Sequence, residues 1–298
     1  MTFWGVRGSI PTPGKTTVRY GGNTPCIEVR LSDNMLIILD AGSGIRNLGE
    51  ELTRTKEKVN AYLMITHAHW DHIQGFPFFR PAWDARTRLT IVGPSRPDKT
   101  LQEIIADQMS KIYFPVQLNA MSASVSFKPV VDQDVFKAGK ATIRTFYVHH
   151  PGYTVGYRIE YKGSSLVYIS DNEPYVRANR NKYPNFEDHI MALYEKEKGD
   201  PNARLVEMCQ EADVLIHDAT YLPEEMPQKI GWGHSDYPFA LKLAADAKVK
   251  RLYLFHHDHT RTDDDVDNIF RLARAEAARE EYLVDCQPAV EGESIDIF

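Results

Sequence analysis

Residues 64–76 read MITHAHWDHIQGF and place three histidines and an aspartate within six positions, directly after an apolar run typical of a buried strand. His67 and His69 are two positions apart, so they project from the same side of an extended chain. Asp71 and His72 follow where the chain turns, so they can face a second position nearby. Because neutral imidazoles and carboxylates bind zinc-type ions, the run predicts halves of two adjacent metal sites.

An alternative interpretation is a group of exposed polar loop residues, which would explain any one of these histidines alone. Other apolar runs argue against it, because they also end in His or Asp. Strand ends are where sites form in layered α/β folds, so these runs are expected to complete the site. The side chains at these ends are His149, His150, Asp171, His256 and His257.

The order of the apolar runs predicts an α/β layered fold with helices outside. Strands are expected at 26–31, 34–40, 60–66, 141–148, 154–161 and 164–170, with helices at 44–55 and 98–111. The end of the chain alternates strand, helix, strand and helix, in the segments DVLIHDA, YPFALKLAADA, KRLYLFHH and DDDVDNIFRLARAEAAREE. No repeat or Pro/Ser-rich linker interrupts the chain. A single domain is therefore expected over 1–298, with a charged insert at about 172–212 whose latter part is helical.

Composition limits the compartment and the partners. No stretch approaches the roughly 20 apolar residues that a membrane span needs, and the first residues lack the layout of a secretory signal. Cys26, Cys209 and Cys286 are odd in number and far apart, which predicts a reduced, cytoplasmic location. The net charge of −6 argues mildly against a surface that holds a long polyanion.

Together these motifs resemble the metallo-β-lactamase superfamily, specifically its ribonuclease Z-like phosphodiesterase branch. The motif His-x-His-x-Asp-His is present at 67–72, and ILDAGSGI resembles the family's second motif, with Asp40 supporting the metal loop. Gly-Tyr-Arg at 156–158 lies at the branch's interval from His150, which selects His150 over His149. The segments SDN, IHDATY and GHSD resemble three further motifs, and they carry Asp171, Asp218 and His234.

The resemblance implies an αββα sandwich with a dinuclear centre along one edge. It implies one metal on His67, His69 and His150, a second on Asp71, His72 and His256, and Asp171 as the bridge between them. Two divalent transition ions are expected. Zinc is the first choice for a His-rich set, and manganese or iron is the alternative.

The same resemblance implies a phosphodiesterase in which a metal-bridging hydroxide attacks phosphorus. His234 is expected to be the general acid, aided by Asp218, and Asp71 is expected to be essential for turnover. A loop histidine that caps the helix beginning near Ser235 is the alternative role for His234. The branch also implies a homodimer.

The opening WGVRGSIPTPG…RYGGNTPC most resembles bacterial and phage cyclic-nucleotide phosphodiesterases. The expected substrate is therefore a small 3′,5′-cyclic nucleotide. The alternatives are a ribonuclease Z-like tRNA 3′-processing endonuclease and a cyclic ribose phosphate phosphodiesterase; a non-catalytic metal-binding scaffold is disfavoured. Processing of tRNA is placed second because the insert has Arg177, Arg180 and Lys182 but is also acidic and lacks a Gly-rich arm.

Several neighbouring residues are interpreted separately. Asp40 in DAGSG either caps a helix or supports the histidine loop through a hydrogen bond. His217 is expected to orient other groups of the site, and core packing is favoured over base stacking for residues 76–79. The remaining histidines are expected to be neighbours of the site or solvent-facing: His257, His259 and His189.

Overall fold

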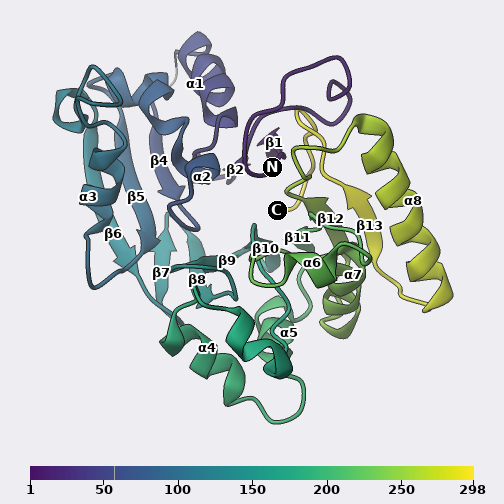
Figure 1. The fold of residues 1–298 in the computed structure, drawn as a ribbon. Coiled ribbons are helices and arrows are strands. Elements are labelled where there is room, and N and C mark those ends of the chain that lie inside the picture. The colour runs from purple at the N-terminus through teal and green to yellow at the C-terminus, as the bar shows by residue number, and fades with distance from the viewer. Residues whose placement is uncertain (57) are drawn as a thin grey trace.

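The computed structural model describes residues 1–56 and 58–298. Two mixed β-sheets stack face to face, and helices cover their outer faces (Figure 1). The first sheet has the order β1 (Thr2–Gly5), β2 (Cys26–Arg30), β3 (Leu36–Leu39), β4 (Asn60–Met64), β5 (Arg88–Pro94) and β6 (Ser124–Val130). The second has the order β13 (Asp285–Pro288), β12 (Arg251–Phe255), β11 (Val214–Asp218), β10 (Ser164–Ile169), β9 (Val155–Tyr161), β8 (Ala141–Tyr147) and β7 (Val135–Ala138).

The helices divide between the two outer faces. In Figure 1, α1 and α3 lie outside the first sheet, and α7 and α8 lie on the opposite side of the molecule. The bounds are α1 (Gly44–Arg54), α2 (Trp70–Ile73), α3 (Leu101–Asp107), α4 (Asp188–Glu195), α5 (Ala203–Cys209), α6 (Met226–Lys229), α7 (Tyr237–Asp246) and α8 (Asp263–Arg279). The described part of the chain also contains the 3₁₀ helices η1 (Phe76–Phe78), η2 (Arg80–Trp83), η3 (Leu118–Ala120) and η4 (Arg177–Lys182). The predicted αββα layering is confirmed.

Strand β3 shows why the layers form. All four of its residues are buried, because alternate side chains point to opposite faces of the sheet. Ile37 and Leu39 enter the core between the sheets, whereas Leu36 and Ile38 pack in the core under α1 and α3. A strand covered on both faces reads as a continuous apolar run, as this one does.

Parallel pairing brings the polar strand ends to one edge. Strand β4 runs parallel to β3, and β10, β11 and β12 run parallel to one another. The carboxyl ends of parallel strands meet at the same edge of a sheet, which is where α/β folds place their sites. The residues that follow β4 and those that follow β10 to β12 therefore face each other across the joint between the two sheets.

The structure corrects several predicted elements. The helix expected at 98–111 is shorter, because Thr100 caps it: its hydroxyl accepts from the Glu103 backbone, and the Glu103 carboxylate accepts from the Thr100 backbone. Strands β5, β6, β7 and β13 were not predicted. Strands β6 and β7 are half exposed, so their residues carry no long apolar run. Segment 172–212 contains η4, α4 and α5, and its helical latter part is confirmed.

Within the described residues, no helix combines the length and apolar character that crossing a bilayer requires. The three cysteines are free and buried. Phe76 and Phe79 are fully buried, which confirms the expected core packing, whereas Phe78 is exposed.

Candidate metal centre

The predicted ligands come together at the joint between the two sheets, in two groups that meet at Asp171. The first group contains His67, His69, His150 and Asp171, and the second contains Asp71, His72 and His256. Within each group, one ligand atom per residue lies within 4.8 Å of the others. His67 and His69 follow β4, whereas the other sheet supplies His150 after β8, Asp171 after β10 and His256 after β12.

Asp171 lies between the groups, and its two carboxylate oxygens face different partners. Oδ2 is 3.6 Å from His67 Nε2 and 3.8 Å from His150 Nε2. Oδ1 is 3.3 Å from His72 Nε2 and 3.6 Å from His256 Nε2. One carboxylate is thus shared by two sets of imidazoles, which is the arrangement that a bridge between two metal ions needs.

Three of the imidazoles contact the protein through Nδ1, which leaves Nε2 facing the cluster, whereas His69 turns its Nδ1 toward the Nε2 atoms of His67 and His150, at 2.9 and 3.1 Å. His72 Nδ1 donates to Asp40 Oδ2 at 2.9 Å, and His150 Nδ1 donates to the Gly233 carbonyl at 2.7 Å. His256 Nδ1 lies 3.1 Å from the Thr220 hydroxyl. A protonated Nδ1 leaves the Nε2 lone pair for a metal ion.

Asp40 is the support that the sequence suggested. It ends β3 with φ of 60° and is fully buried. Its Oδ1 accepts the Thr66 backbone N–H at 2.7 Å, and its Oδ2 accepts from His72 Nδ1 and from the Tyr168 hydroxyl at 2.8 Å. The prediction that Asp40 hydrogen-bonds the histidine loop is confirmed, and Asp40 caps no helix, because α1 begins after Ser43.

The donors fit a pair of cations. His72 Nε2 and Asp171 Oδ1 are buried and make no hydrogen bond to the described residues. Burial would lower the pKa of His72, but the carboxylates of Asp171, Asp71 and Asp40 outweigh it and raise that pKa well above its usual value. Buried carboxylates crowded around one imidazole require a positive charge among them. The His/Asp cluster can therefore bind a dinuclear metal centre.

Burial also lowers the pKa of the imidazoles in the first group, and here it prevails over the nearby carboxylate. It holds the pKa of His67 and that of His150 well below the ordinary value, so both imidazoles are neutral. For Asp171, burial would raise the pKa, but the imidazoles of His256 and His72 outweigh it and lower the pKa well below its usual range. Neutral imidazoles around an ionised carboxylate form a ligand set of the zinc type.

His234 lies beside this cluster. Its ring stacks on that of His256 with centroids 4.8 Å apart, and its Nδ1 is 3.4 Å from Asp218 Oδ2. The same Asp218 oxygen accepts the Ser235 backbone N–H at 2.8 Å, which holds the loop that carries His234. Helix α7 is capped by the Asp236 side chain, so His234 is not its cap.

The glycine before His234 makes this placement possible. Gly233 has φ of +88°, and a Cβ there would collide with the His150 ring. Only glycine permits both this conformation and this close approach.

The other histidines lie outside the cluster. His149 points away into a group of aromatic rings, and its Nδ1 donates to the Glu173 carbonyl at 2.8 Å. Burial lowers the pKa of His149 to about 3. His257 donates to the Ala289 carbonyl, and His217 Nδ1 donates to the Asp218 carbonyl. His189 is exposed, as expected, and His259, which was expected to be a neighbour of the site, is exposed too.

The opening residues support the site, a role that the sequence did not suggest. The Ser9 backbone N–H donates to Asp71 Oδ2 at 2.7 Å, and a Cβ at Gly8 would collide with the His256 ring. Arg7 is fully buried and donates to the carbonyls of Gly21 and Arg261, each at 2.8 Å. The motif WGVRGS therefore positions a loop beneath two candidate ligands.

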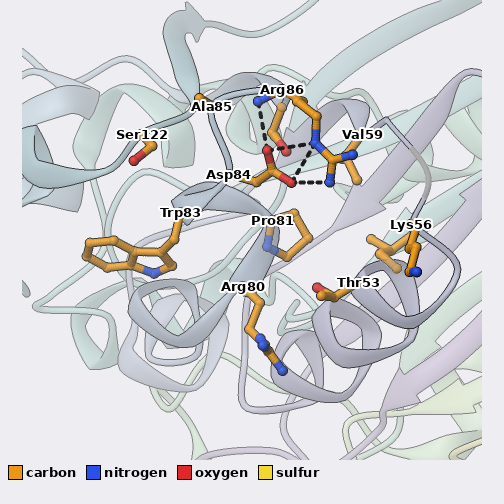
Figure 2. Close-up of a pocket in the computed structure, with 12 residues that line it drawn as sticks. Thr53, Lys56, Val59, Arg80, Pro81, Trp83, Asp84, Ala85, Arg86 and Ser122 are labelled. Atoms are coloured by element: carbon orange, nitrogen blue, oxygen red, sulfur yellow. Dashed lines mark hydrogen bonds and ion pairs between the residues drawn. The ribbon is translucent and has the colours of Figure 1, made fainter.

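A large cavity of about 620 Å³ lies elsewhere, beside α1 and η2 (Figure 2). Its arginines are already paired: Arg86 with Asp84, drawn in Figure 2, and Arg80 with Glu50 at 2.8 Å. None of the residues that line it is a histidine. The volume is large, but the chemistry of a metal centre is absent from its lining.

Comparison with known proteins agrees with this geometry. A family model described as the beta-lactamase superfamily domain matches residues 36–257. A protein named ribonuclease Z, from Thermoplasma acidophilum, is 28% identical over 293 residues, covering 89% of this chain and 88% of that protein.

Solved structures show the same fold. The metallo-β-lactamase fold protein YhfI from Bacillus subtilis has a TM-score of 0.66 and 18% identity, covering 98% of this chain and 96% of that one. Human tRNase Z, short form, has a TM-score of 0.62 and 19% identity, covering 100% of this chain and 98% of that one. The expected metallo-β-lactamase sandwich is confirmed.

These findings correct the expected substrate. The prediction of a small cyclic-nucleotide phosphodiesterase, with tRNA less favoured, is wrong, because relatives that match most of the chain are named ribonuclease Z. The prediction depended on the opening segment, whose Arg7, Gly8 and Ser9 support Asp71 and His256. Residues that hold the metal loops carry no information about which phosphodiester enters.

Proposed function

The chain belongs to the beta-lactamase superfamily, and from that premise we propose that it is a metal-dependent ribonuclease of the ribonuclease Z type, which cuts precursor tRNA at its 3′ end. The observation that carries the proposal is the match to proteins of that name along nearly the whole chain. The shared carboxylate of Asp171 supports it, because hydrolysis of a phosphodiester suits a pair of metal ions.

In this proposal His67, His69 and His150 would hold the first metal ion, Asp71, His72 and His256 would hold the second, and Asp171 would contribute to both. When bound, the two ions neutralise charge on the phosphoryl oxygens and lower the pKa of a water molecule. The protein orients three of the imidazoles, through the Nδ1 contacts of His72, His150 and His256.

His234 is the proposed general acid. Its side chain is about one-tenth exposed and lies against the cluster, so it can reach a leaving oxygen without solvent between them. Asp218 orients the ring through the contact with Nδ1, and the imidazole donates a proton to the leaving 3′ oxygen. A general acid of this kind accelerates a reaction by about 10²–10⁴-fold.

Two exposed tryptophans flank the cluster and suit an RNA substrate. Trp70 lies between the candidate ligands His69 and Asp71 and is 77% exposed. Trp232 precedes His234 by two residues, is 58% exposed, and carries the Lys229 ammonium 4.1 Å from its ring centroid. Single-stranded RNA binds by stacking bases on such rings, each worth about 1–3 kcal/mol.

The insert at 172–212 does not form a free arm. Tyr175, Tyr183 and Tyr194 are buried in the main core, and Arg180 is paired with Asp188 and Glu195. A substrate RNA is therefore held near the cluster itself, by the aromatic rings described above.

The direct test is cleavage of a 3′-extended precursor tRNA by metal-loaded protein, with Asp71→Asn as the inactive control. We expect one cut at the 3′ end of the acceptor stem. The apparent affinity should fall steeply with salt, by tenfold or more between about 50 and 200 mM, because RNA binding releases counterions. Failure to cut any RNA, with both metals bound, would overturn the proposal. The expected homodimer stays a prediction, which light scattering would test.

A further inference from the structure

A narrow apolar slot opens beside the first group of candidate ligands, with a cavity volume of about 120 Å³. His67 and His69 line it on one side. Its floor is aliphatic and buried, and it consists of Ile65, Ile73, Leu101 and Ile105. Figure 1 shows α3, which supplies Leu101 and Ile105, alongside β5 of the first sheet.

The far rim of the slot is polar and aromatic. The Arg96 guanidinium stacks over the Tyr153 ring, 5.1 Å from its centroid. Asp98 fixes that guanidinium, because it accepts from Nε at 3.0 Å and from Nη2 at 3.1 Å. Nη1 makes no hydrogen bond to any described residue and lies 3.9 Å from where a Cβ on Gly152, which also lines the slot, would stand. The two N–H groups of Nη1 therefore remain for a ligand.

The dimensions and chemistry of the slot suit one nucleobase. A cavity of about 150 Å³ holds a benzene ring, so the slot of about 120 Å³, which opens to solvent, takes one base with part of its edge outside and no stacked pair. Aliphatic and aromatic walls bind both faces of a planar ring, and a fixed guanidinium donor suits a ring carbonyl. Because the slot borders His67 and His69, its occupant lies next to the phosphate that reaches the metals.

We propose that this slot binds the base of the nucleotide flanking the scissile phosphate, with Tyr153 and Arg96 as positioning residues at its rim. The proposal rests on the proposed function, because it takes the substrate to be RNA. A base held in the slot fixes the position of the adjacent phosphate over the ligands. The slot therefore contributes to the affinity for RNA and also aligns the bond that is cleaved.

The test measures binding, so it does not depend on turnover. Calorimetry compares uridine 5′-monophosphate with ribose 5-phosphate, which lacks the base, on the metal-loaded protein. We expect the nucleotide to bind about 5- to 100-fold tighter, since stacking one base is worth about 1–3 kcal/mol. Ile104→Trp, a half-buried residue of α3 that lines the slot, should reduce this ratio to about one and leave ribose 5-phosphate binding unchanged.

The matched control is Gln102→Trp, which adds the same side chain to α3 at an exposed position outside the slot. This control variant should keep the wild-type ratio of affinities for uridine 5′-monophosphate and ribose 5-phosphate. Should Ile104→Trp fail to fold, Tyr153→Ala gives the second reading, with a several-fold loss of the ratio. A ratio near one in the wild type, or an unchanged ratio in both slot variants, would overturn the slot. If the protein cleaves precursor tRNA but binds the nucleotide and the ribose phosphate equally well, the slot proposal alone is refuted. If it binds the nucleotide more tightly but does not cleave precursor tRNA, the proposed function alone is refuted.

Discussion

His72 Nδ1 lies 2.9 Å from Asp40 Oδ2, and both side chains are fully buried. The contact links the end of β3 to the helix that carries two candidate ligands. It fixes the imidazole so that Nε2, which makes no hydrogen bond to residues 1–56 or 58–298, points to Asp171. The metal centre therefore depends on a residue that is not one of its ligands.

Asp40→Asn should weaken metal binding and phosphodiester hydrolysis by about 10- to 100-fold, because the neutral amide holds the His72 proton less strongly. Asn tolerates the positive φ at this position, so the fold should survive. Competition with a chelating dye measures the affinity. Tyr168→Phe is the control, because it removes another donor to the same Asp40 oxygen and keeps the contact with His72. Equal losses in the two variants would contradict the role of Asp40.

Elemental analysis of protein purified without chelators should find two transition ions per chain, with zinc the first choice. Chelation should abolish hydrolysis, and added zinc should restore it. His256→Ala removes a donor from the second group only, so it should retain about one ion. A content below one ion per chain after reconstitution of the wild type would refute a dinuclear centre.

His234→Ala should keep both metal ions and lose about 10²–10⁴-fold in kcat on RNA, whose leaving alkoxide needs a proton. The loss on bis(p-nitrophenyl) phosphate should be small, because p-nitrophenolate leaves without one. His259→Ala, an exposed histidine, is the matched control. Equal losses on both substrates would assign His234 to metal binding, which its place near Asp171 and His256 also permits.

Stability should fall in alkaline solution, partly through Cys209. Burial raises the pKa of this thiol from 9.0 to about 12. Between these values the unfolded chain has lost the proton that the folded protein retains, so the free energy of unfolding decreases as pH rises, by about 1.4 kcal/mol per unit for this group.

The change that isolates this effect is Cys209→Ala, which removes the thiol. In urea unfolding, the free-energy advantage of the wild type over the variant should shrink by about 1 kcal/mol between pH 9 and pH 10, and the two should differ by a constant amount below pH 8. Parallel curves throughout would show that the thiol does not titrate in this way.

The local sequence pattern was sufficient to predict the metal loop and the layered fold. Three imidazoles and a carboxylate after an apolar run indicated a metal loop, because residue type and strand periodicity are properties of neighbouring positions. The alternation of strands and helices likewise predicted the layers. The half-exposed strands β6 and β7 were not predicted, because they bury too few apolar side chains to form an apolar run in the sequence.

Only the tertiary structure determined which residues far apart in the sequence contact one another. His149 and His150 are consecutive, but their side chains point in different directions. His149 lies among aromatic rings and His150 lies in the cluster, because the turn after β8 directs the two side chains apart. Likewise, the two oxygens of Asp171 face different imidazoles, and α3 meets the 151–153 turn to form a slot. These contacts join segments many residues apart, and the stacking of two sheets, rather than any local periodicity, brings them within reach.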